Sequence, residues 1–325
     1  MSCAAVLTGL AYAALALAAP NAHADPITPP GFPLHHLRLI IPYPPGGGFD
    51  GLFRPLAERM GQALGQPIVV DNVAGGNGMI GTEQLLHVPA DGYTLLAGGD
   101  NIASSPYVVK GIRWDPLRDF APVAHVAGTP RGIAVNPALP ANDIRELIAL
   151  SHTRSLNYAT ASVGSGPYMI VESLAFDVGL QVTHIPYKGN SQAITGAIAG
   201  QIDMIASSLP PLIGQIRAGR LRGIGVFGNQ RSTLMPELPT LAESGIATEG
   251  NQWYALFVRP GTAGAVIDRL NAATVQALAD PAVATRLVRS GYEIMPSTPA
   301  QLQDILTRSH AYWGKVAKTA GIVPE

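Results

Sequence analysis

Short apolar runs alternate with amphipathic stretches along most of this 325-residue chain. The apolar run from Leu37 to Ile41 predicts a buried strand that stops at Pro42, and residues 50–64 place their apolar side chains on one helical face. The same order of strand, loop and helix recurs over 67–97 and over about 141–226, and long helices are predicted over 263–320. Such repetition is typical of an α/β fold with mostly parallel strands and helices packed on them.

Two extended segments, near 123–135 and 253–258, interrupt this alternation. If they pair, the chain leaves a first lobe once and returns to it once. The first lobe is then 25–125 plus 256–325, the second is 126–255, and the two crossing strands form a hinge. A hinge between two α/β lobes predicts closure around a ligand. The alternative is a single larger sheet with no cleft.

The N-terminus has the features of an export signal. Residues 1–24 contain no Lys, Arg, Asp or Glu, and a short Ala/Leu-rich run is followed by Ala22-His23-Ala24, which is an A-x-A cleavage pattern. The run is too short to span a bilayer, which takes about 20 apolar residues. A basic segment at the start is missing, and the alternative is an Ala-rich tail. We predict a signal peptide over 1–24 and a periplasmic mature protein.

Composition narrows the classes of function. Charged residues make up 13% of the chain, the net charge is −1 and no Lys/Arg block occurs, which argues against nucleic acid as a partner. The one cysteine, Cys3, lies within the predicted signal, so the mature chain has no thiol for a disulfide, a metal or catalysis. Neither an H-E-x-x-H metal motif nor a G-x-S-x-G nucleophile motif occurs. We therefore expect no enzyme, no cofactor, no metal, and a monomer.

The first candidate binding loop is Pro-Tyr-Pro-Pro-Gly-Gly-Gly-Phe-Asp at 42–50, between a strand and a helix. In parallel sheets, ligands bind beyond the carboxyl ends of strands, and glycines let backbone N–H groups approach an anion. We expect Gly47 to take a positive φ. Asp50 is interpreted as the helix N-cap, with ligand contact as the alternative.

Two further strand-to-helix loops resemble the first. Residues 161–168 offer the hydroxyls of Ser162 and Ser165 before Pro167, which suits the first position of a helix. Residues 186–191 contain Lys188, either a counter-charge for a carboxylate or a solvated surface charge. Asp203, at a strand start, is either a ligand contact or a partner for a neighbouring loop. The Gly-x-Gly-x-x-Gly run at 76–81 suggests a dinucleotide site, but the helix after it is too short for that motif.

These loops belong to a set of motifs whose order and spacing resemble the Bug family, the periplasmic receptors of tripartite tricarboxylate transporters. The motifs lie at 41–47 with Asp50, 91–96, 158–159 with 164–165, 186–189, 200–203, 218–221, 239–245, Trp253 and 260–262. The resemblance implies a two-lobed type II (Venus flytrap) periplasmic fold that binds small acids. It also implies that the 43–48 and 162–165 loops hold one carboxylate across the cleft.

The candidate ligand-binding residues combine these loops with neighbouring polar positions. They are Tyr43, Pro45, Gly46, Gly47, Gly48, Asp50, Asn101, Ser162, Gly164, Ser165, Tyr168, Tyr187, Lys188, Asp203 and Ser207. Ser162 and Tyr168 depart from the family pattern, where Gly and His are usual. The partners implied are a carboxylate-bearing solute and membrane transporter subunits; a sensor kinase and a serine hydrolase are the alternative readings.

The export prediction is tested by mass spectrometry of the secreted protein. Cleavage after Ala24 should leave Asp25 as the first residue. A cytoplasmic protein that keeps residues 1–24 would contradict it.

Overall fold

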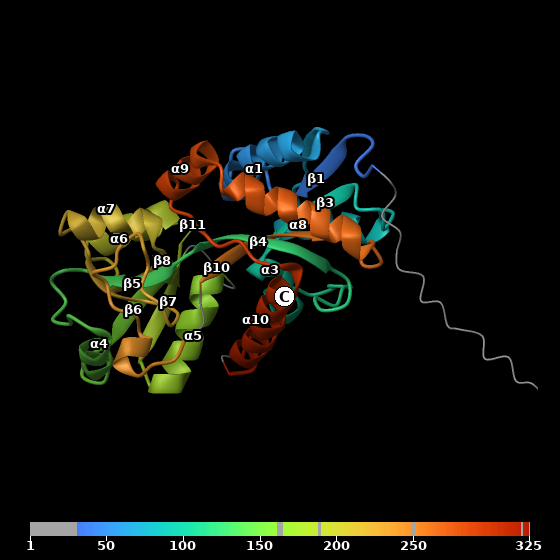
Figure 1. Cartoon of the computed structure of the whole chain (residues 1–325). Coiled ribbons are helices and arrows are strands. Elements are labelled where there is room, and N and C mark those ends of the chain that lie inside the picture. The colour runs from blue at the N-terminus through green and yellow to red at the C-terminus, as the bar shows by residue number, and fades with distance from the viewer. Residues whose placement is uncertain (1–30, 161–164, 188–189, 249–250, 320, 325) are drawn as a thin grey trace, which may run out of the picture.

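Two separate sheets, each covered by helices, form two lobes (Figure 1). The computed structural model describes residues 31–160, 165–187, 190–248, 251–319 and 321–324. The predicted α/β fold with two lobes is confirmed, and the single-sheet alternative is wrong. No helix among the described residues is long and apolar enough to cross a membrane.

The first sheet, sheet A, has six strands in the order β11-β4-β10-β3-β1-β2. Its strands are β1 (Leu37–Ile41), β2 (Ile68–Asn72), β3 (Thr94–Gly99), β4 (Ala121–Thr129), β10 (Gln252–Val258) and β11 (Glu293–Ile294). Its lobe contains the helices α1 (Gly48–Leu64), α2 (Met79–Gln84), α3 (Asp100–Val108), α8 (Gly264–Leu278), α9 (Pro281–Arg289) and α10 (Pro299–Thr319), with short 3₁₀ turns at Gly76–Gly78 and Leu85–His87. Strands β1, β2 and β3 are parallel, whereas β10 is antiparallel to β3 and to β4.

The second sheet, sheet B, has five strands in the order β7-β6-β8-β5-β9. Its strands are β5 (Arg131–Val135), β6 (Leu156–Thr160), β7 (Val182–Pro186), β8 (Met204–Ser208) and β9 (Arg222–Val226). Its lobe contains α4 (Ile144–Ser151), α5 (Gly166–Val178), α6 (Asn190–Ile198) and α7 (Pro210–Arg217), with a 3₁₀ turn at Ala242–Ser244. Strands β6, β7 and β8 are parallel, and β5 runs antiparallel to both of its neighbours.

The apolar pattern of helix α1 explains its place against sheet A. Leu52, Phe53, Leu56 and Met60 are all buried, as the amphipathic spacing predicts. The helix continues through Pro55, which has no N–H to give to the carbonyl of Gly51. Gly51 is exposed, so water can satisfy that carbonyl.

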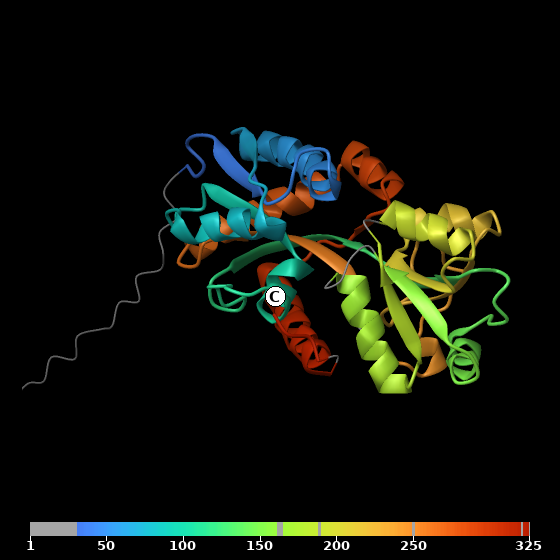
Figure 2. The ribbon, with the colours of Figure 1, turned by 180° about the vertical axis from the view of Figure 1, so that it is seen from behind.

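The chain passes between the sheets at Pro130, which separates Thr129 at the end of β4 from Arg131 at the start of β5. It returns through β10, which pairs with β4 over 252–258. This pairing places residues 126–129 and 252–255 in sheet A, so the boundary between the sheets lies at Pro130. Figure 2 shows α5 and α10 next to each other on one side of the crossing strands, with α1, α7 and α9 on the other side.

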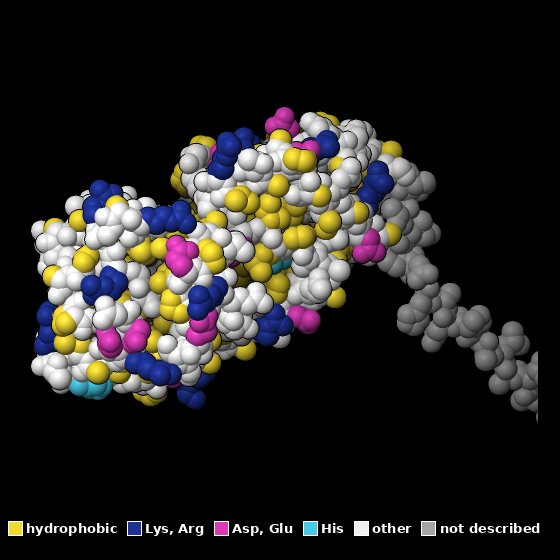
Figure 3. Space-filling model, turned by 60° about the vertical axis from the view of Figure 1, so that its left-hand side comes forward, with side chains coloured by type: hydrophobic (Ala, Val, Ile, Leu, Met, Phe, Trp, Pro, Cys, Tyr) yellow, Lys and Arg dark blue, Asp and Glu magenta, His cyan; other side chains and the backbone are white. Residues whose placement is uncertain are grey.

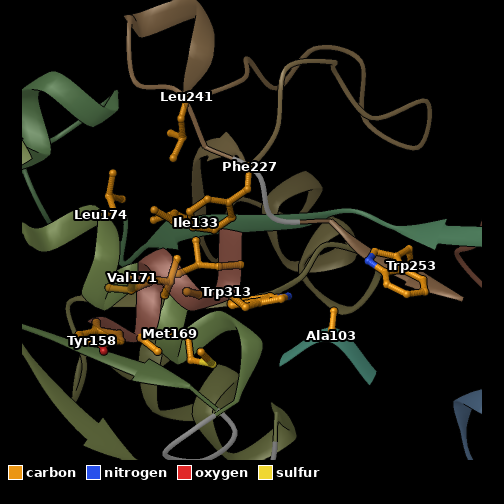
Figure 4. Packing of buried hydrophobic residues seen from close by; sticks show 14 of the residues in the cluster. Ala103, Ile133, Tyr158, Met169, Val171, Leu174, Phe227, Leu241, Trp253 and Trp313 are labelled. Atoms are coloured by element: carbon orange, nitrogen blue, oxygen red, sulfur yellow. The ribbon is translucent and has the colours of Figure 1, made fainter. Parts of the chain in front are cut away.

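One apolar core continues across this boundary. Trp313 of α10 is buried in a cluster that also contains Ile133 and Val171 from the sheet B lobe and Ala103 and Trp253 from the sheet A lobe (Figure 4). Helix α10 accordingly packs on α3 and β4 and also on α5. The last helix of the chain therefore joins the two lobes through apolar contacts.

Replacing Trp313 by Ala should lower the free energy of unfolding by about 3–5 kcal/mol, because it leaves a cavity in the core that both lobes share. Chemical denaturation followed by circular dichroism measures the loss. Phe176→Ala is the matched control, since Phe176 is 70% exposed on α5 and its loss should cost no more than about 0.5 kcal/mol. Equal effects of the two substitutions would contradict the shared core.

Candidate functional site

Both sheets turn the carboxyl ends of their parallel strands toward the crossing at Pro130. In sheet A, the ends of β1 and β3 share an edge with the end of β4, because β10 is antiparallel to both β3 and β4. In sheet B, the ends of β6, β7 and β8 share an edge with the start of β5. Helices α1, α3, α5, α6 and α7 begin near these edges. We call the space between the two edges the cleft.

The first predicted loop lies on the sheet A side of the cleft, and residues 44–48 are exposed there. Its positive φ is at Gly46, at 79°, whereas Gly47 has a φ of −77°. The expectation of a positive φ at Gly47 is therefore wrong. A Cβ at Gly47 would have one neighbour, the Pro44 carbonyl oxygen at 3.5 Å, so this position tolerates a side chain.

Asp50 organises this loop from within α1. Gly47, not Asp50, is the N-cap, so the N-cap interpretation of Asp50 is wrong. Its carboxylate accepts hydrogen bonds from the Gly46 N–H at 3.1 Å, Arg54 Nη2 at 2.6 Å and Asn72 Nδ2 at 3.1 Å. The hydrogen bonds from Arg54 lower the pKa of Asp50 to about 2. The carboxylate is thus used to hold the loop.

Tyr43 packs behind the same loop. Its ring lies 4.6 Å from that of Phe49, and a Cβ at Gly78 would come within 3.0 Å of the Tyr43 ring. Burial, with a further contribution from Asp100, raises the pKa of Tyr43 to about 12. Gly81 likewise makes room for Pro42, whose Cα would lie 2.8 Å from a Cβ there. Two glycines of the Gly-x-Gly-x-x-Gly run therefore serve packing against the first loop.

The second loop leads into α5 on the sheet B side. Ser165 is the N-cap of α5, and its hydroxyl accepts a 3.4 Å hydrogen bond from the Tyr168 N–H. The Tyr168 ring lies 4.8 Å from that of His184, which is hydrogen-bonded to Thr160 at 2.8 Å. Ser162 and Gly164 lie outside the described residues.

A buried ion pair joins the two sides of the cleft, and the sequence analysis missed it. Arg131 Nη2 lies 2.7 Å from Asp100 Oδ2, and their side chains are 5% and 11% exposed. Arg131 begins β5, Asp100 begins α3, and a Cβ at Gly166 would lie 2.6 Å from Arg131 Nη2. The guanidinium therefore lies against the first residue of α5. The available signal was an Arg immediately after Pro130 in an otherwise apolar crossing segment.

Two buried polar atoms at this edge have no hydrogen-bond partner among the described residues. They are Asn101 Oδ1 at the start of α3 and Ser207 Oγ near the end of β8. An unpaired buried polar group costs about 1–3 kcal/mol, so such atoms are suited to bind a ligand or water. The structure places the predicted Asn101 and Ser207 at the cleft edge.

Other predicted residues lie elsewhere or are already engaged. Asp203 precedes β8, at the edge of sheet B away from the cleft, where it binds Arg154 at 2.7 Å and the Asn157 N–H at 3.0 Å. Tyr187 packs over α6, where a Cβ at Gly196 would lie 2.5 Å from its hydroxyl. The structure favours the alternative for Asp203, a structural hydrogen-bond partner, whereas ligand contact by Tyr187, which directly follows β7, stays a prediction.

The last three predicted ligand-binding residues are Pro45, Gly48 and Lys188. Pro45 is exposed in the first loop. Gly48 begins α1 and accepts a 2.8 Å hydrogen bond from the Tyr292 hydroxyl through its carbonyl. Lys188 lies outside the described residues.

Charges of the described cleft side chains cancel in pairs, Arg131 with Asp100 and Arg54 with Asp50. The helix starts therefore supply the remaining positive potential, which arises from unpaired N–H groups and the helix dipole. Figure 3 shows a hollow between the lobes and charges of both signs scattered over the visible face. No group of three or more His, Cys, Asp and Glu side chains suited to a metal occurs among the residues that the structure describes.

Comparisons with known proteins identify relatives of this chain. Residues 52–322 match the family described as tripartite tricarboxylate transporter family receptor. BugT of Bordetella pertussis is 31% identical over 303 residues, which covers 92% of this chain and 93% of BugT.

Two solved structures are similar along nearly the whole fold. A TctC solute-binding protein from Polaromonas, solved with no ligand, is 25% identical and has a TM-score of 0.83, covering 88% of this chain and 99% of that one. An R. palustris protein solved with adipate is 30% identical and has a TM-score of 0.73, covering 90% and 100%.

The engagement of Asp50 predicts a specific acid sensitivity. Its folded pKa of about 2 lies below the unfolded value of about 3.9, so its stabilisation is complete above about pH 4 and is lost as the pH falls toward 2. Asp50→Asn should lower the free energy of unfolding at pH 7 by about 1–2 kcal/mol, because the partner Arg54 is half exposed. Thermal melts between pH 2 and 7 should also show a flatter acid limb for this variant.

Asp268→Asn is the control for this experiment. Asp268 is exposed on α8, and no hydrogen bond or ion pair of its side chain occurs among the described residues. An Asp50→Asn profile that follows the control would contradict the role of Asp50.

Proposed function

The chain belongs to the tripartite tricarboxylate transporter receptor family, and from this membership we propose that it captures a small carboxylate-bearing solute in the cleft between its two sheets. We propose that it does so in the periplasm, delivers the solute to membrane subunits of a transporter, and performs no chemistry on it. The family is described as receptors of tripartite tricarboxylate transporters, which supports a role in solute binding.

The observation that carries this proposal is the convergence of helix starts and unpaired oxygens from both lobes on one edge. Helices α1 and α3 begin on one side of the cleft and α5 on the other. Next to them lie the Ser207 hydroxyl, which can donate to a carboxylate, and Asn101 Oδ1, which can accept from another group of the solute or from water. Backbone N–H groups at helix starts and neutral hydroxyls bind a carboxylate without a net cationic side chain. This fits a cleft in which Arg131 is already neutralised by Asp100.

The class of solute follows from the same balance of charge. Each carboxylate needs its own set of N–H and hydroxyl donors, and the two sides of the cleft provide helix starts for one carboxylate between the first loop and α5. A related receptor was solved with adipate, which is a dicarboxylate. We propose a small mono- or dicarboxylate, with one carboxylate held between Gly46–Gly48 and the start of α5.

The similarity to the ligand-free Polaromonas protein supports closure as part of this function. This chain has a TM-score of 0.83 with that structure at 25% identity, and 0.73 with the adipate-containing structure at 30% identity. The adipate-containing protein has the higher sequence identity but the lower TM-score. We therefore attribute the difference in TM-score to the arrangement of the lobes. We propose that the present arrangement is open and that the lobes, 25–125 with 256–325 and 126–255, close about the crossing strands.

The position of Ser165 supports a receptor over the hydrolase alternative. Its hydroxyl accepts the Tyr168 N–H and so caps the first turn of α5. This is a structural use that also leaves the start of α5 ordered for an anion.

Gly47→Val tests the site directly. The φ of −77° and the open surroundings of Gly47 let the fold accept valine, while the branched side chain stands in front of the start of α1. Carboxylates should first be screened by thermal shift, with adipate among them, because a bound solute raises the melting temperature. Calorimetry with the best solute should then show an affinity loss of at least about a hundredfold, or about 2.7 kcal/mol.

Gly264→Val is the matched control. Gly264 likewise lies at the start of a helix, as the first residue of α8, and a Cβ added there would have no atom within 4 Å. This helix follows the opposite end of β10, away from the cleft. The variant should bind like the wild-type protein, and circular dichroism should show both variants folded. Normal binding by Gly47→Val would remove the first loop from the site.

A further inference from the structure

A second hollow lies between the lobes, on the other side of the crossing strands from α1 and α7. It has a volume of about 970 Å³, within the range of small-molecule sites. One wall is α5, with Ser173 and Asp177, and the other is α10, with Arg308 and Lys315. We call it the rear groove. Figures 1 and 2 show α5 and α10 together below the crossing strands.

The charge of the rear groove is positive on the α10 wall. Arg308 and Lys315 are two turns apart, so they lie on the same face of the helix. Both are exposed, and neither forms an ion pair within the described ranges of the chain. Among the described residues of the lining, Asp177 is the single acidic one, and the Ser173 hydroxyl lies 3.5 Å from its carboxylate. The described part of the lining therefore carries two cations and one anion.

The floor of the rear groove is apolar, with one unsatisfied amide. Ile170 and Leu174 belong to the core cluster, and Ile246 packs against it. Asn251 Oδ1 is buried beside the groove without a hydrogen-bond partner among the described residues, and as an acceptor it can bind water or a donor group of a ligand. The apolar floor below the two cations suits a molecule with an apolar body and one anionic group.

We propose that the rear groove is a second binding site, for a small organic anion with an apolar body, and that its occupancy opposes closure of the cleft. Its two walls come from different lobes, since α10 follows sheet A and α5 belongs with sheet B. Groove and cleft lie on opposite sides of the same crossing strands, so a rotation that narrows the cleft widens the groove. An anion that spans the present groove therefore favours the present arrangement, and by linkage each site weakens the other.

The fluorescent anion anilinonaphthalene sulfonate (ANS) is the probe for this site, since it joins a sulfonate to two aromatic groups. The full-length mature protein should bind ANS with one dominant site in a fluorescence titration. Arg308→Gln with Lys315→Gln should weaken it at least tenfold, and Ala311→Trp should abolish it by filling the groove from exposed α10 surface. Circular dichroism checks that both variants fold.

The matched control removes two cations elsewhere. Lys110 and Arg113 are exposed, lie outside the groove and form no ion pair in the parts of the chain that are described. Lys110→Gln with Arg113→Gln should bind ANS like the wild-type protein. Equal ANS binding by the control and both groove variants would overturn the assignment, as would binding of many ANS molecules with no dominant site.

Coupling is tested by repeating the ANS titration with a saturating carboxylate from the thermal-shift screen. The ANS affinity should fall severalfold, and Gly47→Val should remove this effect without changing ANS binding alone. An unchanged ANS affinity with the carboxylate demonstrably bound would overturn the coupling. If no carboxylate binds at all, the proposed function fails, whereas the groove assignment is still decided by the ANS titrations of the variants.

Discussion

The buried ion pair between Arg131 and Asp100 fixes how the two lobes meet. Each charge would cost several kcal/mol to bury alone, and removing one partner of such a pair typically costs about 3–5 kcal/mol. Because Asp100 begins α3 in one lobe and Arg131 begins β5 in the other, satisfying both charges holds two strand-end edges next to each other. The same ion pair positions the start of α5, because Gly166 lies against the Arg131 guanidinium and a side chain at Gly166 would not fit there.

The crossing strands then separate two surfaces of different chemistry. The cleft side gathers strand ends, helix starts and unpaired oxygens, because the parallel strands of both sheets end there. The rear side gathers the flanks of α5 and α10 over the shared core around Trp313. The hinge thus has polar donors on one side and an apolar, cationic groove on the other. A ligand bound on either side can change how the two lobes are arranged.

Some glycines and charged residues near the cleft hold the first loop in place, and others leave backbone N–H groups open to a ligand. Asp50 fixes the first loop through the Gly46 N–H and Arg54, while Gly78 admits the Tyr43 ring behind it. These contacts hold the loop so that the N–H groups near Gly47 are exposed at the start of α1. A loop that binds through its backbone needs this kind of support, because no side chain of its own can be adjusted to the ligand.

Local pattern was sufficient to predict most of the strands and helices, although not α3 or β11, and to place the candidate binding loops at the carboxyl ends of parallel strands. Periodicity identifies elements such as β1 and α1, and the carboxyl-end rule for parallel strands places Gly46 and Ser165 on facing edges. The two crossing segments predicted two lobes, and the family resemblance added the type II periplasmic fold, because the order of many short motifs along one chain is far more specific than any one of them.

Tertiary structure alone decided which groups became partners. The sequence pattern predicts Asp50 as a helix cap, but the helix begins at Gly48. The Asp50 carboxylate instead accepts hydrogen bonds from Arg54 and Asn72. Asp203 resembles a site residue, but β8 runs so that it lies at the far edge. Arg131 and Asp100 are 31 residues apart, and no local pattern couples them. Periodicity reports which face of an element is buried, whereas the pairing of charges depends on strand register and on how the lobes meet, and these are set by the whole fold.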